Sequence, residues 1–283
     1  MTFTPSVVSI GVRRKVLLVI PACNEEQRLE APLRCYVQYA RGLQYYEVRF
    51  LVVLNGCRDG TAALVARLCG EFPELSSLEY KEPIGKGGAL LAGFRQARDA
   101  EWVGFTDADG ATPPNSLFGL LADPVADVMV GKRDMSTRPF GRRLASFCFN
   151  SLVRLLLGLR TQDAQCGAKF FRAAFLPRIL AQTDTCDMAV DVDLLLAARA
   201  TGAVMQERSV SWSDQPGSKV RALHTSALMF LSVCRLWFLR RCPCMVSRCL
   251  LKINEACYTL IAGQSRRGLP GAPDSQSPHF LSA

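Results

Sequence analysis

Short apolar runs alternate with longer mixed stretches through the first 140 residues of the chain. Apolar runs of this length are typical of strands covered on both faces, and they span 15–21, 48–54, 77–81, 102–107 and 127–133. Stretches with helical spacing follow the first four runs, over 25–41, from Asp59, from Gly87 and after Pro113. The alternation predicts an α/β fold with a mostly parallel open sheet and flanking helices. Ligands of such sheets bind beyond the carboxyl ends of the strands.

The second half of the chain has longer helical stretches. We expect helices over 141–159 and 190–202, a loop over 161–171 and a strand over 204–212. Residues 222–239 are strongly apolar, but they contain Arg235 and are slightly short for a membrane span, which favours an interfacial or re-entrant helix. An amphipathic stretch follows, and a helical hairpin packed on the domain or on a partner is the alternative.

These shifts of pattern divide the chain into four segments. We expect an N-terminal segment over 1–14, one large α/β domain over 15–221, amphipathic membrane-associating helices over 222–262 and a disordered tail rich in Gly, Pro and Ser over 263–283. With 283 residues, 49% of them hydrophobic, the chain can bury a full core.

The formal charge is concentrated at the C-terminal end. Residues 221–283 carry eight Lys or Arg against two acids, which is +6 of the total +9. The residues between these charges are Leu, Met, Phe, Val and Trp, which favours a lipid surface over nucleic acid. The first fifteen residues lack a long apolar segment, so we expect neither a signal peptide nor an anchor there, and we expect the twelve cysteines to be reduced thiols.

The chain has only two histidines, His224 and His279, and both lie after residue 220. Chemistry in the first 220 residues therefore has no imidazole base, no Ser-His pair and no His-ligated zinc. This excludes most hydrolase mechanisms.

Two acids end the apolar run WVGFTDADGATPP, which spans 102–114. Side chains at i and i+2 leave a strand on the same side, so Asp107 and Asp109 can aim at one point and hold a cation there. The alternative is that Asp-Gly and Pro-Pro simply form the turn that ends the strand.

Three other loops follow predicted strands. IPACNEE places Asn24 and Glu25 after the first strand, although Asn24 can also be a cap of the next helix. In LNGCRDGT we interpret Asp59 as structural, a cap for the helix at Thr61. PIGKGGALLAG surrounds Lys86 with glycines before a helix, which favours an anion, but it lacks the spacing of a nucleotide-kinase phosphate loop.

Taken in order, IPACNEE, NGCRDGT, GKGGALLAG, DADGATPP, QDAQCGAKFF and VSWSDQPGSKV resemble family 2 glycosyltransferases of the GT-A fold. The resemblance covers about residues 15–220. It is greatest to the branch that makes dolichyl-phosphate or polyprenyl-phosphate glucose and mannose.

The resemblance implies a role for each matched position. Asp107 and Asp109 would hold Mg²⁺ or Mn²⁺ on the diphosphate of a nucleotide sugar. The substrate-binding positions that it implies are Pro21, Ala22, Asn24, Glu25, Asn55, Lys86, Gly87, Asp107, Ala108, Arg133, Gln165, Lys169, Ser218 and Lys219. Asn55, Cys57 and Ala111 depart from residues common in the family. DADGAT and QCG-x-K are more similar to the glucosyl branch, which favours UDP-glucose over GDP-mannose as donor.

Asp191 and Asp193 are further candidate acids. They either orient sugar hydroxyls, or supply a base for a neutral acceptor, or are ordinary acids at a helix N-terminus; we count Asp191 with Asp107 and Asp109 among the candidate catalytic residues. Asp163 either contributes to the site or only shapes the loop before Gly167. A lipid-phosphate acceptor is largely ionised at neutral pH and needs no strong base, which suits a domain without histidine.

Together with these residues, the resemblance implies an inverting, metal-dependent hexosyltransferase that acts on a polyprenyl or dolichyl phosphate at the cytoplasmic face of a membrane, to which it would bind as a peripheral or re-entrant protein. One alternative is a family 2 enzyme with a saccharide or another lipid as acceptor. The other is a catalytically silent membrane adaptor of the same fold.

Overall fold

The computed structural model describes residues 13–134, 140–183, 185, 187–213, 222–241, 253, 257 and 279–281. The first half alternates strand and helix as expected: β1 (Arg14–Ala22), α1 (Glu30–Arg41), β2 (Tyr46–Asn55), α2 (Thr61–Glu71), β3 (Leu75–Tyr80), α3 (Gly85–Phe94), β4 (Trp102–Phe105), α4 (Pro114–Gly119) and β5 (Val128–Arg133). The second half contains α5 (Phe140–Leu157), β6 (Lys169–Arg172), η1 (Ala173–Phe175), α6 (Leu176–Ala181), α7 (Val190–Ala200), β7 (Met205–Val210), α8 (Ala222–Arg241) and β8 (His279–Leu281).

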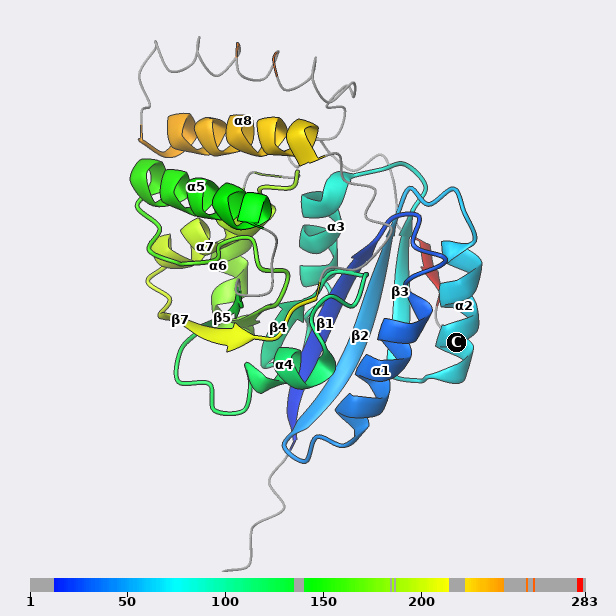
Figure 1. Ribbon diagram of the computed structural model, residues 1–283. Helices are drawn as coiled ribbons and strands as arrows, with labels where there is room; N and C mark the ends of the chain where they lie inside the picture. The colour runs from blue at the N-terminus through cyan, green and yellow to red at the C-terminus, as the bar shows by residue number, and fades with distance from the viewer. Residues whose placement is uncertain are drawn as a thin grey trace, which may run out of the picture.

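The strands form one sheet in the order β7-β5-β6-β4-β1-β2-β3-β8 (Figure 1). The pairs β1–β2, β1–β4, β2–β3 and β5–β7 are parallel, so the carboxyl ends of β1, β2, β3 and β4 meet at one edge. β6 is antiparallel to both β4 and β5. The expectation of a loop through 161–171 is therefore wrong from Lys169 onwards. A strand of four residues is too short to show a period in sequence.

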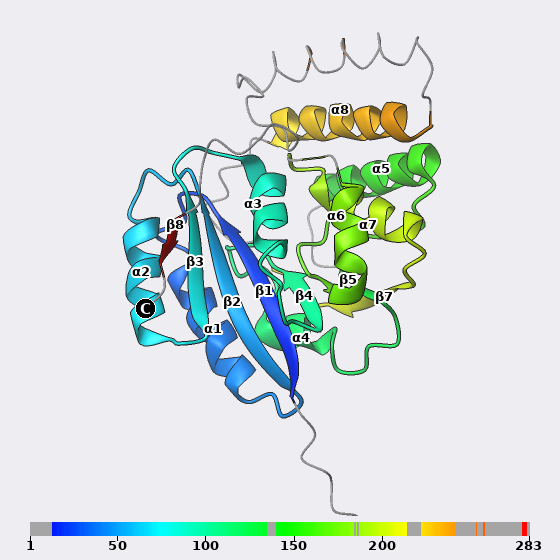
Figure 2. The ribbon, with the colours of Figure 1, turned by 180° about the vertical axis from the view of Figure 1, so that it is seen from behind.

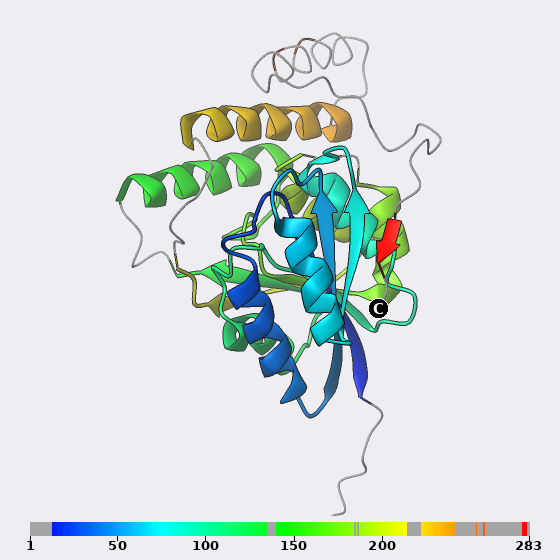
Figure 3. The ribbon, with the colours of Figure 1, turned by 90° about the vertical axis from the view of Figure 1, so that its right-hand side faces the viewer.

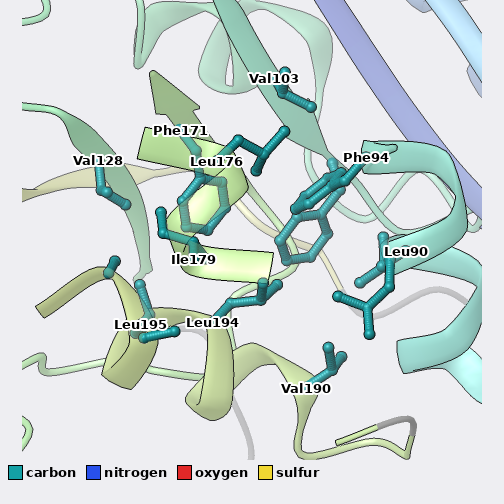
Figure 4. Packing of buried hydrophobic residues seen from close by; sticks show 14 of the residues in the cluster. Leu90, Phe94, Val103, Val128, Phe171, Leu176, Ile179, Val190, Leu194 and Leu195 are labelled. Atoms are coloured by element: carbon teal, nitrogen blue, oxygen red, sulfur yellow. The ribbon is translucent and has the colours of Figure 1, made fainter. Parts of the chain in front are cut away.

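Helices cover both faces of the sheet because successive side chains of the central strands point to opposite sides. Val16, Leu18 and Ile20 of β1 join one core with α1, α2 and α4. Leu17 and Val19 join a second core with α3, α5, α6 and α7. Figure 2 shows the sheet from behind, and Figure 4 shows the second core, where Phe94 of α3 and Phe171 of β6 pack edge to face, with 5.7 Å between ring centroids.

α8 lies across one end of the domain beside α5 (Figures 1 and 3). Val233 and Leu236 are buried in the second core, whereas Phe230 and Leu239 are exposed. Apolar side chains thus lie on both the inner and the outer side of α8. The expectation that 222–262 associates with a membrane stays a prediction. α8 itself packs on the domain, whereas the second helix of the hairpin raised as the alternative falls outside the described residues.

No helix within the described part of the chain is both long and apolar enough to cross a bilayer. Of the residues after α8, only Ile253, Cys257 and 279–281 are described. β8 pairs antiparallel with β3, so the expected disorder of 263–283 is wrong for its last described residues.

Candidate functional site

Two loops at the carboxyl ends of β1 and β2 are tied together by hydrogen bonds. The Asn24 side-chain oxygen accepts the Arg58 backbone N–H at 2.7 Å. The Glu25 N–H donates to the Thr61 hydroxyl at 2.8 Å. Asn24 has a left-handed φ of 56°, and α1 begins only at Glu30. The alternative that Asn24 caps the following helix is therefore wrong, because its side chain reaches across to the neighbouring loop instead.

Asp59 shapes the second of these loops. One of its carboxylate oxygens accepts the Thr61 N–H at 3.0 Å, two residues further on, where α2 begins. Asp59 is therefore structural, as expected, but through this local turn: the N-cap of α2 is Gly60 and no side chain caps it, so the prediction of Asp59 as the helix cap is wrong.

Asn55 fixes the loop that carries Lys86. Its buried side-chain oxygen accepts the Ile84 N–H at 2.7 Å. Gly56 packs against Pro83 of the same loop: a Cβ at Gly56 would lie 2.8 Å from the Pro83 nitrogen, and its φ is +61°. Asn55, expected as a substrate contact, thus has its side-chain oxygen turned to the protein.

Four charged side chains form a chain of ion pairs at this edge of the sheet. Lys86 Nζ lies 2.9 Å from Asp107 Oδ1 and 3.2 Å from Asp191 Oδ2. Lys169 Nζ lies 2.7 Å from the other Asp191 oxygen. The exposed fraction of the side chain falls from 41% for Asp107 to 16% for Lys86, 3% for Asp191 and 0% for Lys169. A ligand can therefore reach Asp107 and Lys86, whereas Asp191 and Lys169 support them from below.

The charges within this chain of ion pairs stabilise one another. Burial lowers the pKa of Lys86, but the carboxylates of Asp107 and Asp191 outweigh burial and raise this pKa above its usual range. Burial raises the pKa of Asp107, but the Lys86 ammonium outweighs it and holds this pKa below its usual range. Lys86 is thus cationic and Asp107 anionic at neutral pH.

Asp107 and Asp109 lie in a turn and not on a strand. β4 ends at Phe105, so strand alternation does not aim the two carboxylates, and that part of the prediction is wrong. The turn nevertheless keeps them close: burial raises the pKa of Asp109, and the charge of Asp107 raises it further. One Asp109 oxygen accepts the Ala111 N–H at 3.0 Å.

The two acids offer the donors that a hard divalent cation prefers. They are carboxylates, they repel each other, and a cation between them would relieve this repulsion. No group of three or more His, Cys, Asp or Glu suited to a metal occurs in the described ranges. Asp107 and Asp109 therefore fit a divalent metal as two of its ligands.

Gly167 is a contributor that the sequence did not single out for this role. A Cβ at this position would lie 2.0 Å from Asp107 Oδ2. Only a glycine leaves room for the carboxylate there. The signal was present in QCG-x-K, but the approach of the two segments depends on the pairing of β4 with β6.

The expected phosphate contacts have unequal access. Arg133 makes a two-pronged ion pair with buried Asp163, with 2.7 Å from Nε to one carboxylate oxygen and from Nη2 to the other. Its guanidinium also lies over the Trp212 ring, 5.5 Å from the centroid. Lys169 is fully buried and turned towards Asp191, so it cannot reach a ligand directly.

The remaining substrate-binding candidates have uncharged side chains or lie outside the described residues. Gln165 is half-buried, and Pro21, Ala22, Gly87 and Ala108 offer mainly backbone, with all but Pro21 buried. Ser218 and Lys219 lie outside the described residues. Asp193 pairs with Arg240 at 2.7 Å on the side of α7 next to α8, so the structure separates it from Asp191.

A cavity of about 1000 Å³ opens beside Arg133 and runs along α5. Its lining is cationic and partly apolar: Lys132, Arg133, Arg143, Leu144, Phe147, Arg154 and Arg160. Leu144 and Phe147 are exposed. Among the described residues, its only acid is Asp163, which is already paired with Arg133. The cavity thus suits an anionic group attached to an apolar chain.

The sequence of this chain matches a known protein family and several known proteins. Residues 17–180 match the family model described as "Glycosyl transferase family 2". The chain is 30% identical over 223 residues to dolichyl-phosphate beta-glucosyltransferase of Drosophila melanogaster, a match that covers 72% of this chain and 68% of that protein. It is 29% identical over 224 residues to a dolichyl-phosphate beta-glucosyltransferase of Trichomonas vaginalis, covering 73% of this chain and 68% of that protein.

A solved structure with a similar fold is glucosyl-3-phosphoglycerate synthase from Mycobacterium tuberculosis, in complex with Mn²⁺, UDP and glucosyl-3-phosphoglycerate. The TM-score is 0.58 at 19% identity, over 78% of this chain and 80% of that chain. This likeness confirms the GT-A fold expected from the sequence.

Proposed function

Because the chain belongs to glycosyl transferase family 2, we propose that it transfers glucose from UDP-glucose to a polyprenyl or dolichyl phosphate, with inversion at the anomeric carbon. Two observations carry the proposal together: the ion-pair chain from Asp107 to Lys169, and the cationic and partly apolar cavity beside Arg133. The names of the relatives support the same donor sugar and acceptor.

The donor would lie over the exposed end of the ion-pair chain. Asp107 and Asp109 would hold Mg²⁺ or Mn²⁺, which neutralises charge on the leaving diphosphate. Lys86 lies 2.9 Å from Asp107 and would exchange that contact for a diphosphate oxygen, while Asp191 continues to hold it from the buried side. A preorganised ammonium of this kind stabilises the leaving group without reorganising during the reaction.

The acceptor would place its phosphate beside Arg133 and Lys132 and its first prenyl units along Leu144 and Phe147. A phosphate monoester is ionised at neutral pH, so one of its oxygens can attack the anomeric carbon directly. The bond from that carbon to the UDP oxygen breaks as the new bond forms, and UDP leaves. Since both Asp191 oxygens are held by lysines, Asp191 fits a role in positioning Lys86 better than a role as a base.

A polyprenyl acceptor resides in a bilayer, so the cavity must open towards a membrane surface. The exposed apolar residues of α5 and α8, together with the basic C-terminal region, support peripheral binding at the cytoplasmic face. We retain 15–221 as the catalytic domain and 222–262 as the membrane-associating segment in this proposal.

The test is transfer of radiolabelled sugar from UDP-glucose and, separately, from GDP-mannose to a short polyprenyl phosphate, with Mn²⁺ or with EDTA. We expect metal-dependent product from UDP-glucose that is lost in Asp109→Ala. The matched control is Asp99→Ala, which removes an exposed carboxylate paired with Lys15 and Arg49. If product forms from GDP-mannose and not from UDP-glucose, GDP-mannose replaces UDP-glucose as the proposed donor.

Two results would overturn the acceptor or the activity. Transfer to a free saccharide in preference to the lipid phosphate would favour the alternative acceptor class. No transfer with any donor, together with unchanged UDP binding in Asp107→Ala and Asp109→Ala, would favour the silent adaptor.

A further inference from the structure

The first turn of α7 carries two buried acids with different partners. Asp191 is paired with Lys86 and Lys169 of the site. Asp193 is paired with Arg240 of α8 at 2.7 Å, and its other oxygen accepts the Thr185 N–H at 3.0 Å. Residues two apart on a helix point about 200° away from each other, so one acid faces the site while the other faces away from it.

α8 is attached to this turn by polar contacts as well as apolar ones. The Ser232 hydroxyl donates to Asp187 at 2.7 Å, just before α7 begins. Arg240 also donates to the Gln182 carbonyl oxygen at 2.7 Å. Between these two points Val233 and Leu236 enter the same core as Val190 and Leu194 of α7. The end of α7 that holds Asp191 is therefore fixed from the far side by α8.

We propose that the Arg240–Asp193 ion pair is a positioning device for catalysis: it holds the first turn of α7 where Asp191 keeps Lys86 directed at the donor diphosphate. The inference rests on the proposed function for its activity readout. Asp193 is fully buried and the Arg240 side chain is 22% exposed, so solvent does not replace either partner easily. Asp191 and Asp193 share one helical turn, so a shift of that turn moves both.

The test uses the full chain with Arg240→Met, which keeps the stem and removes the charge, and Arg240→Lys, which keeps the charge. The control is Arg41→Met, because Arg41 makes an equally short two-pronged pair with Glu74 on the surface, away from the site. We expect Arg240→Met to lower kcat/KM for UDP-glucose about tenfold, with the KM for polyprenyl phosphate little changed. Arg240→Lys should recover most of the loss, and Arg41→Met should match wild type.

A second variant covers the case in which Arg240→Met unfolds the protein because Asp193 is left buried without its ion-pair partner. Asp193→Asn with Arg240→Met removes both charges, so no unpaired charge remains buried. This double variant should fold and still show the reduced kcat/KM. A double variant that folds and has wild-type kcat/KM would overturn the proposal, as would equal losses in Arg240→Met and Arg41→Met.

Hydrogen exchange gives a readout that does not need turnover. In Arg240→Met the backbone amides of the first turn of α7 should exchange faster, and those of α2 should not change. Faster exchange confined to α8 would overturn the positioning role. If the wild type transfers no glucose, the proposed reaction fails, and exchange at α7 still decides whether α8 fixes this turn.

Discussion

Two sets of ion pairs in this protein have similar geometry but opposite surroundings. Arg34 and Arg67 bridge Glu30 and Glu71 between α1 and α2, with distances of 2.7–2.9 Å. Their side chains are 32–50% exposed. In the chain of Asp107, Lys86, Asp191 and Lys169 the distances are 2.7–3.2 Å, but exposure falls to 0%. Distance alone therefore does not show which ion pairs matter.

Solvent explains the difference. Water screens the pairs between α1 and α2 and hydrates each charge when its partner is removed, so such pairs add little stability. A charge within the buried chain has no such replacement, and removing its partner leaves it unpaired in a poorly hydrated place. We infer that the buried ion-pair chain directs Lys86, whereas the exposed ion pairs between α1 and α2 contribute little to stability or to the site.

The largest effect should come from removing the ammonium at the open end of the buried chain. Lys86→Met should lower kcat/KM for UDP-glucose by about 10² to 10³, because the diphosphate loses a preorganised cation. Steady-state transfer assays at saturating Mn²⁺ measure this loss. The control is Arg67→Met in the exposed network, and similar losses in both variants would contradict the comparison.

The next effect is on folding. Asp191→Asn should lower the free energy of unfolding by about 3–5 kcal/mol, because it leaves the fully buried Lys169 ammonium without a carboxylate. Glu71→Gln removes a carboxylate that also has two cationic neighbours, Arg34 and Arg67, and should unfold close to wild type. Urea denaturation of the two variants measures the difference, which would vanish if burial were unimportant.

A smaller effect should follow from crowding Asp107. Gly167→Ala places a Cβ where Asp107 Oδ2 now lies and should lower kcat/KM about tenfold by displacing the carboxylate. Gly119→Ala is the matched control, since a Cβ there meets nothing within 4 Å. Transfer assays on both proteins provide the measurement, and equal activities would show that Asp107 tolerates the displacement.

The smallest effect concerns pH. Burial raises the pKa of Asp163, but the Arg133 guanidinium outweighs it and holds the pKa below its usual range. A lowered pKa means that the Asp163–Arg133 pair stabilises the fold above the unfolded pKa of about 4 and loses this contribution as pH falls through the folded value. The stability gap between wild type and Asp163→Asn should therefore narrow below about pH 4, as denaturation at pH 7 and pH 3.5 would show. A gap independent of pH would contradict this.

The sequence predicts the central elements well because their signal is local. Long apolar runs identify β1 and β2, which are buried on both faces. The four-residue β6 was missed, and β4 ends two residues before Asp107, so the alternation inferred from a longer strand did not apply. Short strands depend on their neighbours in the sheet, which a local pattern does not contain.

The candidate site residues show the same difference between features that depend on local sequence and features that depend on distant segments. Asp107, Asp109 and Lys86 were proposed as candidates from local sequence, because two acids end an apolar run and a lysine stands among glycines before a helix. The partners were not: Asn55 binds Ile84 29 positions away, Lys169 binds Asp191 at 22, and Asp193 binds Arg240 at 47. Each such pair forms only after distant segments pack together.

By itself the sequence determined the α/β class, the order of the central strands and helices, and which loops contain the candidate site residues, because periodicity and loop composition act over a few residues. The tertiary structure alone decided that Asp191 supports Lys86, that Asp193 instead secures α8, and that Gly167 leaves space for Asp107. These are outcomes of burial and of the approach of distant segments, and burial sets how strongly two charges interact.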